Sequence, residues 1–367
     1  MAGEVRQPID VPSLERYLDQ NVPEVKTPIE IKQFGFGQSN PTYQLITADG
    51  RKLVLRKKPP GKLLSKTAHR VDREYQIIKA LGSTNVPVPE ALCLCEDSNV
   101  IGTPFYIMEF LDGRHFVDPT MPGVSPEERT ALWKSAVETL AKFHSVVPQS
   151  VGLENFGKSS GFYDRQIATF TAVSQAQSEV LDKDTKEPVG ELPHFKDMVN
   201  FFSEKSTQPR DRGTLVHGDY KIDNMIFHKT EPRVIGILDW EMATVGHPLS
   251  DLCNLTSPYV MDGAENSKDE FQPGRVPGLP RREDCIRWYA AVSGYNPADD
   301  MLWGDAFFAF RASVIMQGIA ARYAARQASS ARAAEYGSRA KPFALEAWGR
   351  VKQVQDLSRQ KSQKSKL

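Results

Sequence analysis

Between residues 215 and 243, three short apolar runs alternate with polar turns, and this segment constrains the possible folds more than any other. The first run is followed by His217 and Asp219, the second begins after Asn224, and the third ends at Asp239. Runs of this length are typical of buried strands, and the interruptions are typical of tight loops. The segment therefore predicts polar side chains at strand ends, where a rigid scaffold can hold them in a cleft.

The spacing of these polar residues suits phosphoryl transfer. Asp219 and Asn224 lie five residues apart, and Asp239 follows fifteen residues later. Phosphoryl transfer needs a carboxylate that orients and deprotonates the acceptor hydroxyl, and a carboxylate plus an amide oxygen that hold magnesium. We therefore expect Asp219 to be the catalytic base and Asn224 and Asp239 to be metal ligands. The alternative is two buried strands with ordinary polar turns, since Asp and Asn are common in turns.

The two loops together resemble those of the aminoglycoside phosphotransferase and choline kinase family, rather than those of protein kinases proper. The resemblance rests on His217-Gly218-Asp219 followed by four residues and Asn224, and on Ile237-Leu238-Asp239-Trp240-Glu241. It implies ATP and Mg²⁺ as cofactors. It also implies that His217 orients the loop and does not itself move protons.

The same resemblance implies an α+β, protein-kinase-like fold with two lobes. The smaller lobe would be an antiparallel sheet with one helix, and the larger lobe would be mainly helical. We expect an N-terminal nucleotide-binding lobe at residues 1–110, a catalytic and acceptor lobe at 111–354, and a flexible tail at 355–367. Within the larger lobe, residues 281–353 have the periodicity of helices.

A glycine-containing stretch precedes the strand-like residues 43–47. Gly35 and Gly37, with Ser39 and Asn40, would let backbone N–H groups approach the phosphates of a nucleotide. Its place ahead of the catalytic loop favours a phosphate-covering loop, although such a stretch by itself is usually only a hairpin.

A strand over residues 52–57 ends in cations. Kinase-like enzymes hold the nucleotide phosphates with a lysine on this strand, braced by a glutamate on the next helix. Residues 68–81 would form that helix and supply Glu74, but Arg56 stands where the lysine is usual. Arginine binds phosphate with a different reach and geometry. The anchor is therefore Arg56 or, if the strand shifts, Lys57, and a solvated strand end is the alternative.

Residues 105–113 are expected to connect the two lobes. In the resemblance this is the hinge, where the backbone of Glu109 and Leu111 would contact the adenine and Met108 would lie behind it.

Composition excludes little but argues against some partners. Lysine plus arginine and aspartate plus glutamate both number 46, so net charge favours neither nucleic acid nor a membrane surface. No apolar run approaches the roughly 18 residues that span a bilayer, and no secretory signal opens the chain. The four cysteines lack paired metal-ligand spacing, and a reducing intracellular compartment is expected.

The chain ends in Ser365-Lys366-Leu367, the form of a peroxisomal address. We therefore expect peroxisomal localisation and an import receptor as a partner for these three residues. The polar and basic residues 355–364 suit an exposed tail.

Several stretches narrow the resemblance to the phosphotransferase-like domain at the N-terminus of certain acyl-CoA dehydrogenases. These stretches are Leu55–Gly61, Ala68–Glu74, Gly246–Leu252 and Met316–Tyr323. In that group the domain phosphorylates the 4-hydroxyl of hydroxyacyl-CoA, which is the acceptor that the resemblance implies. Arg322 and Arg326, four residues apart on an expected helix, could face the phosphates of such an acceptor.

Two other functions stay open. One is a kinase for an amino alcohol, an aminoglycoside or choline. The other is a nucleotide-binding pseudokinase that serves as a scaffold. The intact Asp219, Asn224 and Asp239 argue against the scaffold, whereas Arg56 at the lysine position favours it.

Overall fold

A computed structural model describes residues 2–35, 40–59, 70–261, 269–328, 330 and 332–364. The chain divides into two compact units, each built from two segments. The first unit comprises Met1–Glu154 and His217–Ala243, and the second comprises Asn155–Val216 and Thr244–Leu367. Residue 110, where a lobe boundary is expected, lies inside the first unit. None of the helices in the described ranges is both long and apolar enough to cross a membrane.

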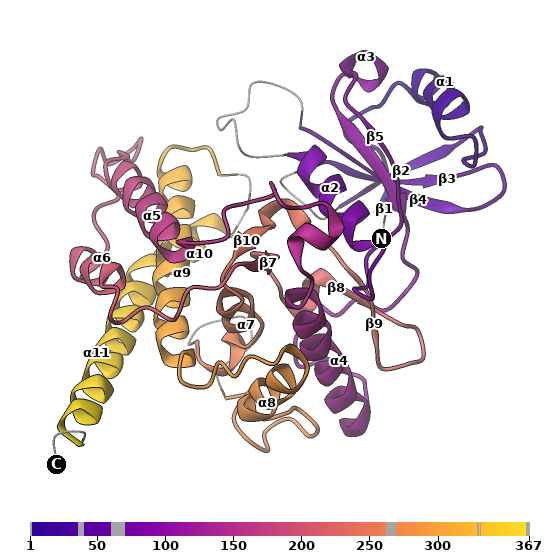
Figure 1. The fold of residues 1–367 in the computed structure, drawn as a ribbon. Helices are drawn as coiled ribbons and strands as arrows, with labels where there is room; N and C mark the ends of the chain where they lie inside the picture. Colours follow the sequence, from indigo (N-terminus) through magenta and orange to yellow (C-terminus); the bar gives the residue numbers. More distant parts are fainter. Residues whose placement is uncertain are drawn as a thin grey trace. The chain divides into compact units, whose positions relative to one another are not determined.

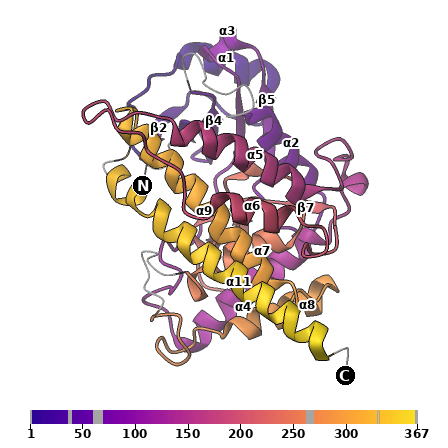
Figure 2. The same ribbon diagram turned by 90° about the vertical axis from the view of Figure 1, so that its left-hand side faces the viewer.

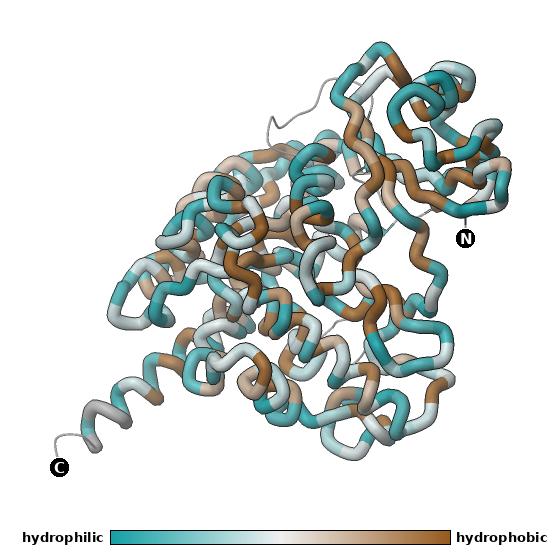
Figure 3. Tube along the Cα trace, turned by 45° about the vertical axis from the view of Figure 1, so that its right-hand side comes forward, coloured by the Kyte–Doolittle hydropathy of each residue, from teal (hydrophilic) through white to brown (hydrophobic). Residues whose placement is uncertain are grey.

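The first unit is organised around a six-stranded antiparallel sheet, drawn in indigo and purple in Figure 1. Its order is β1-β2-β3-β4-β6-β5. The strands are β1 (Ala2–Gly3), β2 (Glu30–Phe34), β3 (Thr42–Ile46), β4 (Lys52–Lys57), β5 (Ala91–Cys95) and β6 (Phe105–Glu109). Hydrophobic residues recur along these strands, as the brown segments of Figure 3 show. The predicted antiparallel sheet is confirmed.

The two faces of this sheet have different partners, because side chains alternate along a strand. On one face, Tyr43, Leu55 and Ile107 pack with α1 (Val11–Asn21) and α3 (Ser98–Ile101) in a buried hydrophobic core. The other face carries Val54, Arg56, Tyr106 and Met108, which alternate with those core positions. The sheet therefore separates an apolar core from a face that bears a charged side chain.

The rest of the first unit contains helices, short 3-10 helices and a second strand pair. The additional elements are α2 (Val71–Leu81), α4 (Pro126–His144), η1 (Pro148–Val151), η2 (Ile222–Asn224), β8 (Met225–Phe227), β9 (Val234–Ile237) and η3 (Trp240–Met242). Strands β8 and β9 pair as an antiparallel hairpin. A Cβ added to Gly236 would lie 1.9 Å from Leu111 Cδ1, and one added to Gly113 would lie 2.3 Å from Phe227 O. Glycine at both positions lets residues 111–113 pack closely on this hairpin.

The second unit is mainly helical, with one short antiparallel strand pair. Its elements are α5 (Phe162–Ser178), α6 (Phe195–Ser203), β7 (Thr214–Val216), β10 (Thr244–Gly246), α7 (Leu249–Leu255), η4 (Ser257–Tyr259), α8 (Arg282–Ser293), α9 (Met301–Ala324), α10 (Ala333–Ser338) and α11 (Ala340–Lys364). The long helices α9 and α11 lie side by side in Figures 1 and 2. An antiparallel sheet in the first unit and mainly helices in the second make up the predicted α+β class.

One expectation for the second unit is wrong. Helix α11 continues to Lys364, so residues 355–364 of the expected tail are helical; these ten residues contain neither Gly nor Pro and include several good helix formers. Arg326 lies beyond the end of α9, with φ of 56°, and it pairs with Asp182 and Asp184. It is therefore not one turn below Arg322 on a common helix. Ser365, Lys366 and Leu367 lie outside the described residues.

Candidate active site

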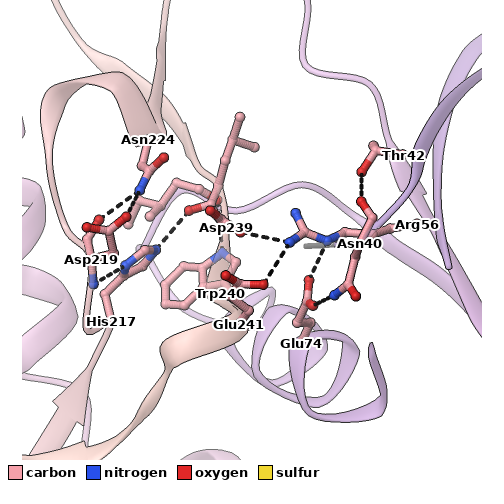
Figure 4. A network of polar contacts seen from close by, with 12 residues as sticks. Asn40, Thr42, Arg56, Glu74, His217, Asp219, Asn224, Asp239, Trp240 and Glu241 are labelled. Atoms are coloured by element: carbon pink, nitrogen blue, oxygen red, sulfur yellow. Dashed lines mark hydrogen bonds and ion pairs between the residues drawn. The ribbon is translucent and has the colours of Figure 1, made fainter. Parts of the chain in front are cut away.

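The predicted catalytic loop begins with a buried histidine, His217, that fixes its backbone (Figure 4). The N–H of Asp219 donates to His217 Nδ1 at 3.2 Å, and His217 Nε2 lies 2.8 Å from the carbonyl oxygen of Leu238. Because Nδ1 accepts a hydrogen bond, Nε2 carries the proton and donates to Leu238. His217 thus ties the loop to the residue before Asp239.

Gly218 makes this turn possible. Its φ is +87°, a region that L-residues with side chains avoid, and an added Cβ would lie 2.7 Å from Met242 Cβ. The chain can therefore turn sharply between His217 and Asp219 and bring Asp219 away from the buried histidine.

Asp219 and Asn224 face each other across the loop. The Asn224 Nδ2 group donates to the Asp219 carbonyl oxygen at 2.8 Å and to Asp219 Oδ2 at 3.0 Å. About a third of the Asp219 side chain is exposed, so the carboxylate remains accessible while its orientation is held. The structure thus brings together the two residues that the five-residue spacing suggested.

Lys221 is a neighbour of this carboxylate that the sequence analysis missed. Its Nζ lies 3.4 Å from Asp219 Oδ2 and 3.3 Å from Asp223 Oδ2. Burial by itself would lower the pKa of Lys221, but the two carboxylates raise it above its ordinary value. Its position two residues after Asp219 could have indicated this contact, although a lysine in a loop is usually only solvated.

Asp239 occupies an unusual backbone conformation directly after β9. Its φ of 63° and ψ of 59° are left-handed, which Asp tolerates better than most residues. The N–H of the preceding Leu238 donates to the Asn224 carbonyl oxygen at 2.8 Å, so the two predicted metal residues belong to adjoining backbone segments. Such left-handed non-glycine residues cluster at functional sites.

The chemistry of these two side chains suits magnesium. Because Asn224 Nδ2 faces Asp219, its Oδ1 is the atom that could bind a metal, and Asp239 adds a carboxylate. Magnesium commonly uses one or two such protein oxygens and takes the others from phosphates and water. Within the described part of the chain, no group of three or more His, Cys, Asp or Glu side chains is arranged to hold a metal by itself.

Arg56 connects the sheet to this region through three carboxylates. Its Nε lies 3.0 Å from Glu74 Oε2, and its Nη2 lies 2.8 Å from Asp239 Oδ1 and 3.6 Å from Glu241 Oε2. Burial by itself would lower the pKa of Arg56, but Glu74 and Asp239 raise it above its ordinary value. The guanidinium is thus a fixed cation beside the expected metal site.

Glu74 in the first turn of α2 is the buried centre of a polar cluster. Besides Arg56, it accepts a hydrogen bond from Asn40 Nδ2 at 2.7 Å and one from the Tyr106 hydroxyl at 2.9 Å. Burial raises the pKa of the Glu74 carboxyl, and Arg56 and Tyr106 oppose that shift. Glu74 is only 1% exposed, so its partners determine where Arg56 is held.

Residues 36–39 of the predicted phosphate-covering loop lie outside the described residues. Asn40 is buried and its side-chain amide donates to Glu74, and the contact of its backbone N–H with phosphate stays a prediction. Gly35 lies at the end of β2, and in the described structure no atom comes within 4 Å of a Cβ added there. Gly37 and Ser39 lie outside the described residues.

Lys57 lies on the opposite face of the sheet from Arg56. Its Nζ is 5.6 Å from the centre of the Tyr43 ring, its side chain is buried, and burial lowers its pKa. Strand register separates it from the carboxylates that hold Arg56, so the geometry is at odds with the alternative that Lys57 is the anchor.

The expected hinge follows β6 directly. Met108 is buried on the same face as Arg56, in register with Val54. The Glu109 N–H donates to the Glu90 carbonyl oxygen at 2.9 Å, so a contact of Glu109 with adenine would use its carbonyl group. Leu111 packs on Gly236 of the hairpin that lies between Asn224 and Asp239. The hinge and the loops are therefore joined by direct packing.

Comparison with known proteins agrees with this geometry. The sequence profile described as the phosphotransferase enzyme family matches residues 30–284. Acyl-CoA dehydrogenase family member 10 from Mus musculus is 38% identical over 349 residues, which cover 94% of this chain and 31% of the relative. Acyl-CoA dehydrogenase family member 11 from Homo sapiens is 38% identical over 322 residues, which cover 86% of this chain and 39% of the relative. The chain therefore spans well under half the length of these relatives.

Solved structures show the same fold. A crystal structure from Ralstonia eutropha, whose protein is named after the aminoglycoside phosphotransferases, has a TM-score of 0.81 and 34% identity. The match covers 94% of this chain and 99% of that one. An aminoglycoside phosphotransferase in complex with streptomycin and ATP has a TM-score of 0.55 at 15% identity. This match covers 89% of this chain and 99% of that one, and it supports the fold alone.

These matches confirm the predicted family, fold class and enzyme class. The chain belongs to the phosphotransferase enzyme family and has the protein-kinase-like fold of the small-molecule phosphotransferases.

Proposed function

We propose that this chain transfers the γ-phosphoryl group of ATP to a hydroxyl group of a small molecule, with magnesium as its metal. One observation carries the proposal: a single compact unit holds an accessible Asp219, oriented by Asn224, together with the Arg56–Asp239 ion pair. A base, two oxygen ligands and a fixed cation are the parts that phosphoryl transfer requires.

In the proposed reaction Asp219 accepts the proton of the acceptor hydroxyl. The hydroxyl oxygen forms a bond to the γ-phosphorus, and the bond from that phosphorus to the bridging oxygen breaks, which releases ADP. Asn224 and Lys221 hold the Asp219 carboxylate in place, and His217 holds the loop backbone. Magnesium, when bound by Asn224 and Asp239, would neutralise charge on the phosphates.

Nucleotide recognition is assigned to the sheet and the hinge. Arg56 would bind phosphate oxygens, with Glu74 as its brace, and the backbones of Glu109 and Leu111 would contact adenine. Met108 would lie behind the base. Gly35, Gly37 and Ser39 would approach the phosphates through their N–H groups.

The proposed acceptor is 4-hydroxyacyl-CoA. Support comes from the relatives named as acyl-CoA dehydrogenase family members, which cover most of this chain. A second candidate, an aminoglycoside or amino alcohol such as choline, is favoured by the names of the solved structures. The two acceptors differ in charge, since coenzyme A is anionic and the others are cationic.

Transfer of labelled γ-phosphate tests the proposal. Wild-type protein with MgATP is incubated with 4-hydroxyacyl-CoA, an aminoglycoside panel or choline, and the labelled products are separated. We expect label on the acyl-CoA with wild-type protein but not with Asp219→Asn. Asp184→Asn, at an exposed carboxylate of the second unit, is the matched control and should retain activity. Label on an aminoglycoside or choline alone would show that the acceptor is cationic and would rule out 4-hydroxyacyl-CoA. ATP binding without any transfer would favour the pseudokinase scaffold.

We also propose that the protein is imported into peroxisomes through Ser365, Lys366 and Leu367. A fluorescent protein fused to the N-terminus should be found in peroxisomes, and deletion of the three residues should leave it in the cytosol. Cytosolic fluorescence of the undeleted fusion would refute the signal.

A further inference from the structure

One exposed histidine reaches the predicted metal site from outside the loops that form it. His115 lies in the segment that follows β6, and its Nε2 is 2.6 Å from the carbonyl oxygen of Asp223. Because a carbonyl oxygen can only accept a hydrogen bond, Nε2 carries the proton and donates. Asp223 directly precedes Asn224, so the bond is made to the peptide unit that joins these two residues. His115 and Asp223 are 108 positions apart, and no motif in the sequence connects them.

The backbone beside His115 is firmly attached to β8. The Arg114 N–H donates to the Phe227 carbonyl oxygen at 2.7 Å, and the Phe227 N–H donates to the Arg114 carbonyl oxygen at 2.8 Å. The Arg114 side chain adds a hydrogen bond from Nε to the His228 carbonyl oxygen at 2.9 Å and an ion pair with Glu128 at 2.7 Å. His115 therefore projects from a fixed support, although its own side chain is exposed.

The peptide unit before Asn224 is held at both of its polar groups. Its N–H, which belongs to Asn224, donates to the Lys221 carbonyl oxygen at 3.0 Å. Its carbonyl group, which belongs to Asp223, accepts the hydrogen bond from His115. Without the second bond this unit could rotate, and the φ angle of Asn224, which directs its side chain, would no longer be fixed.

The peptide unit after Asn224 does not depend on the histidine. The Met225 N–H donates to the Ile222 carbonyl oxygen, and the Asn224 carbonyl oxygen accepts from the Leu238 N–H at 2.8 Å. These bonds join residues of the catalytic and metal loops to one another. The bond from His115 differs from them because it comes from a side chain outside both loops.

The exposure of His115 limits what this bond can contribute to folding. Water competes for both partners of a hydrogen bond at the surface, so the net effect on stability is small. Its effect on Asn224 can be larger, because removing a group that orients a metal ligand typically lowers metal affinity about 10- to 100-fold.

We propose that His115 is a positioning residue for the metal: by holding the Asp223 carbonyl group, it fixes the backbone of Asn224 and keeps the Asn224 Oδ1 available to the ion. This inference rests on the proposed function, because it concerns a residue assigned to magnesium there. His115 takes no part in the proton transfer.

Calorimetric titration of the full chain with ATP, once with excess Mg²⁺ and once with EDTA, separates metal binding from nucleotide binding. The ratio of the two affinities measures what the metal adds. For His115→Ala we expect this ratio to fall about tenfold, the lower end of the range for groups that orient metal ligands, with an unchanged affinity in EDTA. His115→Gln retains an N–H donor at a similar reach and should keep most of the ratio.

Three further measurements make the result decisive. Asn224→Ala should remove most of the gain from Mg²⁺, because it removes a ligand itself. His194→Ala is the matched control, since His194 is another exposed histidine with a hydrogen bond of its own, to Asp197, and it should change neither affinity. His115→Ala should unfold at a urea concentration close to that of wild type, because its side chain is exposed.

The outcomes are distinct. An unchanged ratio in His115→Ala would overturn the positioning role and leave the proposed function intact. Equal losses of affinity with Mg²⁺ and with EDTA, or a loss in His115→Gln as large as that in His115→Ala, would also overturn it. Wild-type protein that binds no ATP, or binds it equally well with and without Mg²⁺, would refute the proposed function itself, and the positioning role with it.

Discussion

Two buried histidines, one in each unit, make the same pair of hydrogen bonds. His217 Nδ1 accepts from the N–H two residues later at 3.2 Å, and so does His247 Nδ1, from Leu249. Each Nε2 faces a distant carbonyl oxygen, that of Leu238 for His217 and that of Arg210 for His247. The same local device therefore fixes two turns in the chain.

The residues after each histidine make the difference. Gly218 and Asp219 follow His217, and the carboxylate emerges partly exposed. Pro248 and Leu249 follow His247, and the chain enters helix α7, whose Asp251 is fully buried. A histidine turn by itself thus indicates only a fixed loop. An accessible acid after the turn, with other charged groups around it, is what makes the first turn a candidate for chemistry.

The sharpest test of this contrast is Asp219→Asn, which keeps the size of the side chain and removes the base. We expect kcat to fall about 100- to 10,000-fold, the usual contribution of a general base, with ATP affinity nearly unchanged. Steady-state kinetics and calorimetric ATP binding measure the two quantities. Loss of ATP binding to the same extent as kcat would show that Asp219 acts on the structure of the site and not as a base.

Arg56→Met tests whether the first turn depends on the cation that binds both Glu74 and Asp239. Glu74 would remain buried without its charged partner, so the free energy of unfolding should fall by about 3–5 kcal/mol. Urea unfolding measures this change. The double variant Arg56→Met/Glu74→Met removes both charges and should recover most of the loss. A single variant as stable as wild type would contradict a buried ion pair at this site.

Lowering the pH should destabilise the fold through His247 in the second turn. Burial lowers the pKa of His247 to about 4, from an ordinary value of 6.5. The unfolded chain therefore binds a proton between these values that the folded chain does not, and stability should fall as pH drops from about 6.5 to about 4. The loss from this group would be about 3 kcal/mol at most. Urea unfolding at pH 7, 5.5 and 4.5 measures it.

His247→Gln is the control for this pH dependence. It removes the titrating group, so its stability, lower throughout, should depend less steeply on pH than that of wild type. An unchanged slope would assign the acid sensitivity to other groups.

Tyr106→Phe should have the smallest effect. It removes the hydroxyl that donates to Glu74 and leaves the ring in the sheet, so the free energy of unfolding should fall by about 1.5–3 kcal/mol. If Tyr106 also positions Arg56, the KM for ATP should rise while kcat changes little. Tyr323→Phe, at an exposed tyrosine of the second unit, should change neither. A stability loss without any change in KM would limit Tyr106 to a structural role.

The loop at Asp219 was predictable because its contacts are local. His217, Asp219 and Asn224 lie within eight consecutive residues, and their hydrogen bonds follow from a tight turn. Strands at residues 43–47 and 52–57 were also predicted from short apolar runs. Contacts of this kind depend on neighbours in sequence, so a pattern of residue types is enough to indicate them.

The Arg56 network could not be predicted in the same way. Arg56 and Asp239 are separated by 183 residues, and the choice between Arg56 and Lys57 depended on which face of β4 turned toward α2. A shift of one residue in register would have exchanged them. The hydrogen bond from the Asn40 side-chain amide to Glu74 was likewise not predicted, because the two residues are 34 positions apart.

Sequence alone was therefore sufficient for the family, the fold class and the residues on the catalytic loop, because motif spacing and apolar periodicity are local properties. Tertiary packing selected Arg56 over Lys57, gathered Asn40 and Tyr106 around Glu74, and stacked Phe34 on Phe110 across two intervening strands. These arrangements arise from strand register and from the need of a buried charge for partners, and both depend on segments far apart in the chain.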